Sequence, residues 1–199
     1  MKIKMLVLIA LLASLVLSAC GGTASAPKTL DLTKAVLKAE DLPAGFTQYT
    51  TDQMAAININ EESLSESFAG VFNEAKLENF AVFSNGDAAN PALIFSLIFY
   101  PLSQADIDKW NTELNDPTKL KEGFASGFGG TVDLNNAYKG IADGSAGFDT
   151  NTGGFNIGII IARRSNAAFM IMTMGLQADV LDTLAIAKNM DARMVEGFK

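Results

Sequence analysis

The sequence predicts the α+β fold class, with a mainly antiparallel sheet covered by helices on both faces. Short apolar runs rich in β-branched and aromatic side chains are typical of strands, and residues 155–164 and 167–174 are two such runs separated by two residues, as in a β-hairpin. Other segments have the three-to-four-residue apolar spacing of amphipathic helices. Three of the predicted strands are apolar on both alternating faces, so we expect helices to cover both sides of the sheet.

The expected helices are interspersed among the strands along the chain. Leu32, Val36 and Ala39 recur at helical spacing after a candidate N-cap, Asp31, and Pro43 ends this first helix. The remaining elements are, in order, a strand at 46–50, a helix at 61–75, strands at 77–84 and 92–100, a helix from 103 through 114, a helix from 117 to the glycines at 127–130, weak strands at 136–141 and 146–150, the hairpin, and a helix at 178–196.

Several boundaries carry local signals. Ser103 and Asp106 have the spacing of a capping box, and Pro117 stands at a first helical position. Residues 165–166 are the expected turn of the hairpin, because asparagine at the second position tolerates a positive φ. Residues 92–100 (ALIFSLIFY) are apolar on both faces, which predicts a central strand.

Composition limits the chemistry that the chain can perform. It has 199 residues, a formal net charge of −7, no histidine and one cysteine. The acidic balance argues against nucleic acid as a partner, because phosphates need a basic surface. Without histidine there is no imidazole base, and one cysteine forms neither an internal disulfide nor a cysteine-rich metal site. We therefore expect no cofactor. The length of the chain suits a single globular domain, which we place at residues 30–199.

Residues 1–19 have the pattern of a secretory signal peptide. Lys2 and Lys4 give it a basic start, and residues 5–16 carry no charge. As a helix this run would span about 18 Å, well short of the roughly 30 Å hydrocarbon core of a bilayer. The run is therefore interpreted as a signal and not as a membrane span.

Leu17-Ser18-Ala19-Cys20 follows the apolar run. This tetrapeptide, at this position, resembles the lipobox of bacterial lipoproteins, [LV]-[AST]-[AG]-C. The resemblance implies that the signal peptide is cut between Ala19 and Cys20, and that the Cys20 sulfur carries a diacylglycerol with acyl chains of the palmitate type. The alternative is a soluble secreted protein that is cut at the same site and keeps a free thiol.

Lipidation would place the protein outside the cytoplasm, on the cell membrane or on the outer membrane of a cell that has one. Each methylene buried in the bilayer contributes about 0.8 kcal/mol to membrane binding. Two or three acyl chains on Cys20 would therefore bind the protein to the membrane far more tightly than one. Residues 20–29, many of them small, are expected to form the lipidated tether. The expected partners are the lipid bilayer, through the acyl chains on Cys20, and an unknown envelope protein or small ligand.

A weaker resemblance covers the body of the chain from residue 30 to residue 199. The segments Asp41-Leu42-Pro43-Ala44-Gly45-Phe46, Arg163-Arg164-Ser165-Asn166 and Asp191-Ala192-Arg193 are similar to those of many small bacterial lipoproteins, some of which resemble the Mog1/PsbP-like α/β/α fold. That group has no shared chemistry, so the resemblance implies a fold and no site residue.

Three patterns in the body have a functional and a structural interpretation. Methionines at 170, 172 and 174 would line one face of a strand, where their sulfurs suit Cu(I). We favour the other interpretation, which is that they pack in the core. Residues 149–154 begin like a calcium loop, but Ile160 stands in place of the bidentate glutamate, which favours a hairpin loop. Arg163 and Arg164 are candidate anion contacts, or else the solvated tip of the hairpin.

The function predicted from the sequence is a non-enzymatic binding, sensing or accessory module of the cell envelope, anchored to a membrane. One alternative is an envelope hydrolase that uses paired carboxylates, such as Asp106 with Asp108 or Glu61 with Glu62. Residues two apart on a helix do not face each other, which weakens that alternative. The other alternative is a carrier that holds an apolar ligand in a cavity beside the sheet.

Overall fold

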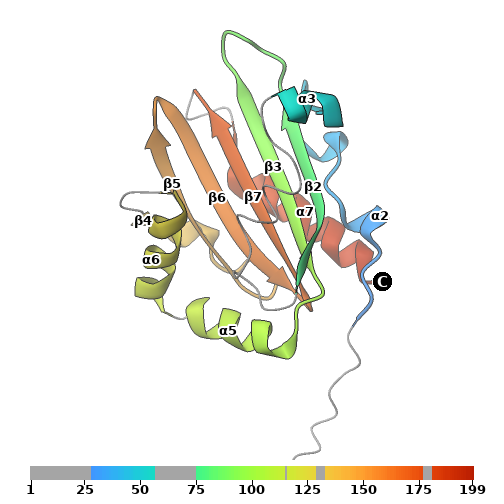
Figure 1. The fold of residues 1–199 in the computed structure, drawn as a ribbon, viewed down its shortest axis with the longest axis vertical. Helices are drawn as coiled ribbons and strands as arrows, with labels where there is room; N and C mark the ends of the chain where they lie inside the picture. The colour runs from blue at the N-terminus through green and yellow to red at the C-terminus, as the bar shows by residue number, and fades with distance from the viewer. Residues whose placement is uncertain (1–27, 57–74, 115, 129–132, 177–180) are drawn as a thin grey trace, which may run out of the picture.

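The protein has an α+β fold built on one antiparallel sheet of seven strands, as the sequence predicts (Figure 1). The computed structural model describes residues 28–56, 75–114, 116–128, 133–176 and 181–199. The strand order is β1-β2-β3-β7-β6-β5-β4. The strands are β1 (Thr47–Gln48), β2 (Lys76–Ser84), β3 (Ala92–Tyr100), β4 (Asp133–Leu134), β5 (Ser145–Thr152), β6 (Phe155–Arg164) and β7 (Ala167–Gly175).

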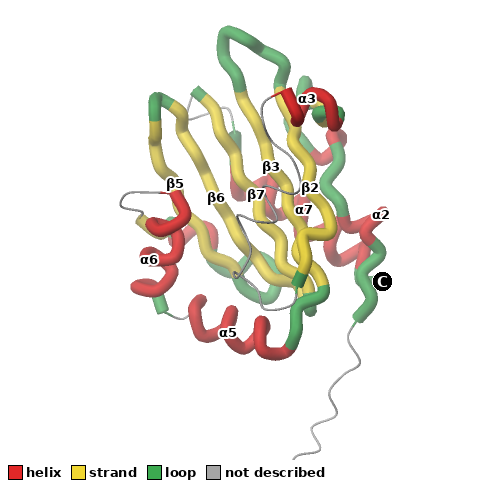
Figure 2. Tube along the Cα trace, in the orientation of Figure 1, coloured by secondary structure: helices red, strands yellow, loops and turns green. Residues whose placement is uncertain are grey.

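The helices are short apart from three, and Figure 2 separates them from the strands by colour. They are α2 (Leu32–Ala35), η1 (Ala39–Asp41), α3 (Thr51–Ala56), α5 (Gln104–Leu114), α6 (Pro117–Phe128), η2 (Asn136–Tyr138) and α7 (Thr183–Gly197), where η marks a 3₁₀ helix. In Figure 1, α7 runs behind the sheet, while α5 and α6 lie at its lower and left edges. Among the described residues, no helix is long and apolar enough to cross a membrane.

The sheet separates two groups of buried apolar side chains. On one face, Ile94 and Ile98 of β3 belong to the same cluster as Met190 and Met194 of α7. On the other face, the alternate β3 residues Phe95, Leu97 and Phe99 belong to a second cluster, which includes Trp110 of α5 and Leu120 of α6. Because β3 lies between β2 and β7 and is apolar on both faces, its predicted central position is confirmed.

The predicted helix boundaries at α5 and α6 are confirmed by their capping contacts. The Asp106 backbone N–H donates to Ser103 Oγ, and the Ser103 backbone N–H donates to Asp106 Oδ2, each at 3.2 Å, which is a capping box. Asp116 caps α6 by accepting from the backbone N–H groups of Thr118 and Lys119, with Pro117 at the first helical position as expected.

Three predicted elements differ from those observed. The first helix is interrupted, because Val36 is extended and separates α2 from η1. Residues 136–141 form no strand: Asn135 accepts a hydrogen bond from the Ala137 backbone N–H and turns the chain into η2. The closing helix starts at Thr183 and not at 178, because Asp182 is its N-cap.

Other differences concern turns and unpredicted elements. In the β6–β7 hairpin the positive φ of 55° falls on Ser165 and not on the expected asparagine, Asn166. Helix α3 was not predicted from the sequence, and the predicted helix at 61–75 lies almost wholly outside the described residues. Despite these differences, the long strands lie at or near the predicted ranges.

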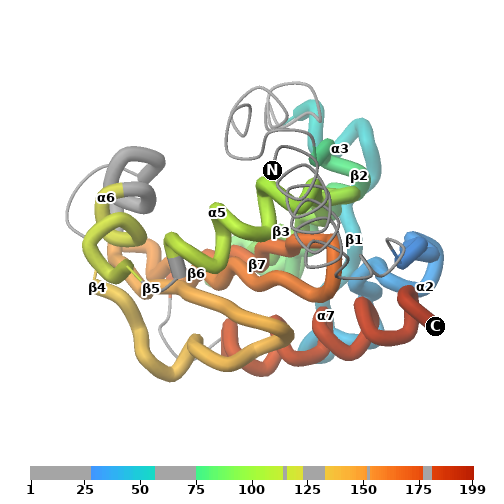
Figure 3. The backbone as a smooth tube through the Cα atoms, turned by 90° about the horizontal axis from the view of Figure 1, so that it is seen from below, coloured from blue at the N-terminus to red at the C-terminus, as the bar shows by residue number. Residues whose placement is uncertain are grey.

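The two ends of the described chain meet at the C-terminal end of α7. The Asp31 backbone N–H donates to the Gly197 carbonyl at 2.9 Å. Gly197 is buried, and a Cβ there would lie 2.8 Å from Ala35 Cβ and 2.9 Å from Leu30 Cδ1. Figure 3 shows α2 beside the last turn of α7. The residues that directly follow the predicted tether therefore pack on the end of this helix.

Candidate functional site

An open pocket of about 430 Å³ lies where strands β5, β6 and β7 meet the N-terminal end of α7. This volume is within the range of small-molecule sites. Its lining combines hydroxyl, carboxylate and amide side chains with a few apolar ones. The lining residues are Tyr138, Asp149, Thr150, Asn156, Ile157, Gly158, Thr173, Gly175, Leu181, Asp182 and Thr183.

Gly158 on β6 provides the space in which the polar side chains approach one another. A Cβ at this position would lie 2.2 Å from Thr183 Oγ1, 3.0 Å from Thr173 Oγ1 and 3.1 Å from Asp149 Oδ1. Side chains from a helix, a central strand and a neighbouring strand therefore converge above one residue that has no side chain of its own.

Tyr138 and Asp149 form the first polar pair of the pocket. The Tyr138 hydroxyl donates to Asp149 Oδ1 at 2.5 Å, and Asn135 Nδ2 donates to Asp149 Oδ2 at 2.7 Å. Burial raises the pKa of Tyr138 well above its ordinary value of 10.0, and the hydrogen bond to the Asp149 carboxylate raises it further. The phenol is therefore protonated at neutral pH, and its proton lies on the Asp149 side.

Thr173 and Thr183 form the second polar pair. Their Oγ1 atoms are 2.6 Å apart, and Thr173 Oγ1 also lies 3.5 Å from the Gly158 carbonyl oxygen, which it can reach as a donor. Both side chains are buried, with 3% and 4% of their surface exposed. Because buried hydroxyls are costly without partners, this contact fixes the start of α7 against β7.

A second open pocket, of about 650 Å³, lies between η1 and α7. The Arg193 guanidinium in it binds Asp41 through Nε and Nη2, at 2.9 and 2.8 Å, and Glu40 through Nη2 at 2.6 Å. The hydrogen bond to Asp41 raises the pKa of Arg193, followed by the bond to Glu40. We interpret this cluster as a structural connection between η1 and α7, because Asp41 and Glu40 already bind the Arg193 guanidinium.

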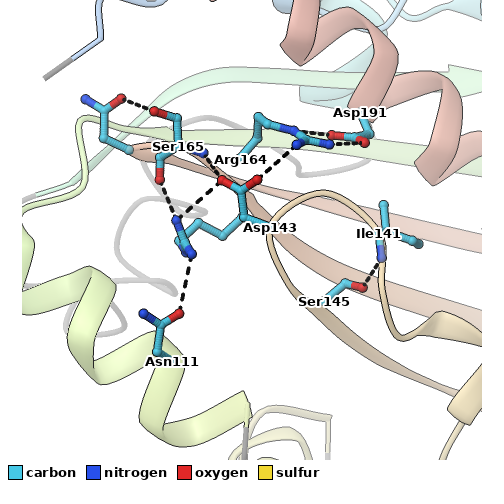
Figure 4. Close-up of polar contacts among 9 residues, drawn as sticks. Asn111, Ile141, Asp143, Ser145, Arg164, Ser165 and Asp191 are labelled. Carbon is cyan, nitrogen blue, oxygen red and sulfur yellow. Dashed lines mark hydrogen bonds and ion pairs between the residues drawn. The ribbon is translucent and has the colours of Figure 1, made fainter. Parts of the chain in front are cut away.

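The predicted anion contacts Arg163 and Arg164 lie at the end of the β6–β7 hairpin. Figure 4 shows Arg164 between Asp191 and Asp143. Arg164 donates through Nε and Nη2 to both oxygens of Asp191 on α7, and through Nη1 to Asp143 Oδ1 at 2.9 Å. The hydrogen bond to Asp191 raises the pKa of Arg164. The forked donor thus binds carboxylates of the protein itself, and an external anion at this position stays a prediction.

Arg163 takes part in the same cluster. Its Nη1 donates to the Ser165 carbonyl oxygen at 2.8 Å and lies 3.6 Å from Asp143 Oδ2, while Nη2 reaches Asn111 of α5 at 3.4 Å. The Ser165 backbone N–H donates to Asp143 Oδ2 at 2.6 Å (Figure 4). The hairpin tip is therefore held between α5 and the loop before β5.

The other candidates from the sequence are placed as follows. Cys20 and Ala19 lie outside the described residues, as do Glu61 and Glu62. The three methionines of β7 lie on one sheet face, packed in or against the second apolar cluster, as the core-packing interpretation expects. Residues 149–152 belong to strand β5, and Gly153 and Gly154 form the tight β5–β6 turn, with positive φ of 62° and 86°. Among the described residues, no group of three or more acidic, histidine or cysteine side chains is arranged to hold a metal.

The paired acids proposed for a hydrolase have separate structural positions. Asp106 is buried, with 2% of its surface exposed, and belongs to the α5 capping box. Asp108 is exposed and accepts a hydrogen bond from Gln104. They lie two residues apart on one helix, as the sequence shows, so they do not face a common substrate position.

Sequence reasoning missed the pocket itself. Four side chains are central to the pocket: Tyr138, Asp149, Thr173 and Thr183. Only Asp149 belongs to a sequence pattern with a functional interpretation, the incomplete calcium loop. Tyr138 fell in a predicted strand, Thr173 in the apolar strand of the hairpin and Thr183 inside the predicted closing helix, with no shared motif. The one signal in the sequence points to Thr173. It is a polar residue that stands between Met172 and Met174 in an otherwise apolar strand.

Comparisons with known proteins do not connect this site to a characterised one. No protein-family model matches the chain, and no curated protein matches it.

Proposed function

We propose that the folded domain binds a small polar molecule in the pocket at the start of α7 and performs no catalysis. The observation that carries this proposal is the convergence of buried hydroxyls from three elements, Tyr138, Thr173 and Thr183, on an open space of about 430 Å³. Buried polar groups held in fixed geometry are what orient a ligand in such sites. The polar lining favours this function over a carrier of apolar ligands.

The state of the polar groups also favours binding over chemistry. A phenol whose pKa is raised is neither a nucleophile nor a base at neutral pH, because it remains protonated. The Asp149 carboxylate accepts from Tyr138 and from Asn135, which suits a fixed acceptor. The pocket thus supports recognition, and this argument is the reason for preferring a binding module to a hydrolase.

The binding function has a direct test by NMR. A library of small polar molecules is added to the ¹⁵N-labelled domain, and the amide signals of Gly158 and Thr183 are followed. We expect a subset of compounds to shift these signals, and Thr183→Val to abolish the shifts. Ser103→Ala, which weakens the α5 cap by about 1 kcal/mol far from the pocket, is the matched control for stability. A library that leaves both amides unmoved would contradict the proposed function.

We further propose that the domain is carried outside the cytoplasm on a lipid-modified Cys20. The proposal is supported by the Leu17-Ser18-Ala19-Cys20 pattern and by the basic and apolar segments before it. Expression of the full chain in a lipoprotein-processing bacterium should give a product that carries acyl mass and partitions into membranes. Cys20→Ala should lose both properties, while Ser25→Ala in the tether keeps them. An unmodified wild-type product in the soluble fraction would refute the anchor.

We also propose that helices cover both faces of the sheet, in the manner of a Mog1/PsbP-like α/β/α fold. Met190 of α7 in one apolar cluster and Trp110 of α5 in the other support the proposal. If both faces are covered, Met190→Ala and Trp110→Ala should each lower the free energy of unfolding by roughly 2–5 kcal/mol. A near-zero effect at either position would mean that its face is not a core.

A further inference from the structure

We propose that the ligand of the pocket at the start of α7 is an organic ammonium ion, a molecule that presents a protonated amine to Asp149, Tyr138 and Thr183. This inference rests on the proposed binding function and specifies its ligand class. It follows from the charge of the lining, from the hydrogen bonds among the hydroxyl groups and from the size of the pocket.

The lining is negatively charged. Asp149 and Asp182 are the charged residues among those that line the described pocket, and no lysine or arginine is among them. The N-terminal end of a helix by itself favours an anion. Here that end is already occupied, because the Asp182 carboxylate accepts from the Ala185 backbone N–H at 2.9 Å. The net field in the pocket therefore attracts a cation.

One arrangement of the hydrogen bonds directs all three hydroxyl protons into the protein. Tyr138 donates to Asp149, so its oxygen acts as an acceptor, which the Thr183 and Asn135 side chains also approach. Thr173 reaches the Gly158 carbonyl oxygen, and Thr183 lies 2.6 Å from Thr173 Oγ1. With Thr173 donating to that carbonyl and Thr183 donating to Thr173, the Thr183 oxygen is also left as an acceptor.

A set of acceptors is matched by a ligand group that only donates. An ammonium group carries three N–H donors and no acceptor, and its bonds to a carboxylate are charge-assisted. A sugar or alcohol would bring as many acceptors as donors, and its acceptors would gain nothing from the Asp149 and Asp182 carboxylates, which only accept. The pocket volume of about 430 Å³ is that of a molecule with several carbon atoms and not of a bare ion.

Three linear probes of similar length separate the ligand classes. They are 1,4-diaminobutane, 1,4-butanediol and succinate, which present ammonium, hydroxyl and carboxylate ends. Binding of each is measured from the shifts of the Gly158 and Thr183 amide signals during titration at neutral pH. We expect the diamine to bind about tenfold or more tightly than the diol, and succinate not to shift these signals, because a hydrogen bond to a charged group contributes more than a neutral one.

Charge-removing variants show whether the attraction is local. Asp149→Asn keeps an oxygen to accept from Tyr138, and Asp182→Asn keeps a good helix cap, so both should fold. Each should weaken diamine binding about fivefold or more. Glu78→Gln, which removes one exposed charge on β2, is the matched control and should change the affinity less than twofold.

These experiments distinguish a wrong ligand class from a pocket that binds no ligand. Preference for the diol or for succinate at these amides would overturn the ammonium class and leave a ligand-binding pocket. Equal weakening by Asp149→Asn and Glu78→Gln would mean diffuse attraction to an acidic protein, which also overturns the class. If none of the three probes shifts the amides, the ammonium class is wrong, and the library titration alone then decides whether the pocket binds ligands.

Discussion

Gly158 is the residue on which the pocket depends most directly. Its missing side chain leaves room for Thr183, Thr173 and Asp149, each of which would lie within 3.1 Å of a Cβ at this position. An added methyl group would therefore either close the floor of the pocket or push α7 away from the sheet.

Gly158→Ala should accordingly lower the free energy of unfolding by roughly 1–3 kcal/mol, as measured by urea denaturation. The closest atom to the new methyl is Thr183 Oγ1, at 2.2 Å. The effect of the alanine should therefore be smaller when it is introduced into a Thr183→Ala background. Equal effects in the two backgrounds would show that the hydroxyl is not the obstacle.

Tyr138 should ionise only at a pH above the ordinary range of a tyrosine, because burial and the Asp149 carboxylate raise its pKa. A group with a raised acid pKa stabilises the folded state at pH values below its unfolded pKa, near 10. That contribution is lost as the pH rises from about 10 towards the folded pKa. An absorbance titration of phenolate should show a late phase that is missing in Tyr138→Phe. Stability above pH 10 should also fall less steeply in that variant.

At the scale of elements, the β6–β7 hairpin is attached to α7 by ion pairs. Arg164 on the hairpin binds Asp191 on the helix through two parallel hydrogen bonds, and Asp143 joins them from the loop before β5. The side chains of Arg164 and Asp191 are 26% and 18% exposed, so water screens the pair only in part. This geometry predicts a measurable coupling between the two elements.

A double-mutant cycle with Arg164→Ala and Asp191→Ala should give a coupling energy of about 1–3 kcal/mol in equilibrium unfolding. Arg164→Lys should recover only part of it, because an ammonium does not reproduce the forked contact. The exposed pair of Lys121 and Asp133 is a control, with an expected coupling below about 1 kcal/mol. A similar value for both pairs would contradict the structural role of Arg164.

The long strands were predictable because their signals are local. Residues 155–164 of β6 and 92–100 of β3 match the predicted ranges, since a mainly apolar run bounded by turn residues leaves little choice of structure. The weak strand at 136–141 was wrong because one side chain, Asn135, bonds the local backbone and favours a 3₁₀ turn. Such a contact competes with strand pairing and has no periodic signature.

The pocket was not predictable, for a different reason. Tyr138, Asp149, Thr173 and Thr183 come from η2, β5, β7 and α7, and they meet only because the sheet order places β6 between β5 and β7. Strand order is a property of the folded chain and not of a local pattern. The pair at residues 165–166 shows the same limit on a smaller scale: the turn was expected there, but the positive φ lies on Ser165.

For the molecule as a whole, α7 joins the two ends of the described chain. Its last residue, Gly197, lies against Leu30 and Ala35, close enough that a methyl group would contact both within 3.0 Å. Asp31 adds a backbone hydrogen bond to the same residue. The segment after the predicted tether is thus part of the folded domain.

Gly197→Ala should loosen this junction and lower the free energy of unfolding by about 1–3 kcal/mol. Amide hydrogen exchange should become faster at Asp31 and at the first turn of α2, while the amides of β3 keep their relative protection. Val195→Ala, at a position on the same helix that is 40% exposed, is the control and should change stability by less than about 0.5 kcal/mol. Unchanged exchange at Asp31 would contradict the proposed junction.

The placement of α7 separates the pocket from the end of the domain that follows the predicted tether. The helix has 15 residues and therefore a length of about 22 Å, with Leu30 and Asp31 packed at one end and the pocket at the other. A protein fastened to a bilayer through Cys20 would hold its pocket away from the point of attachment. The residues at which the predicted tether enters the domain and the residues that line the pocket would then lie at opposite ends of one helix.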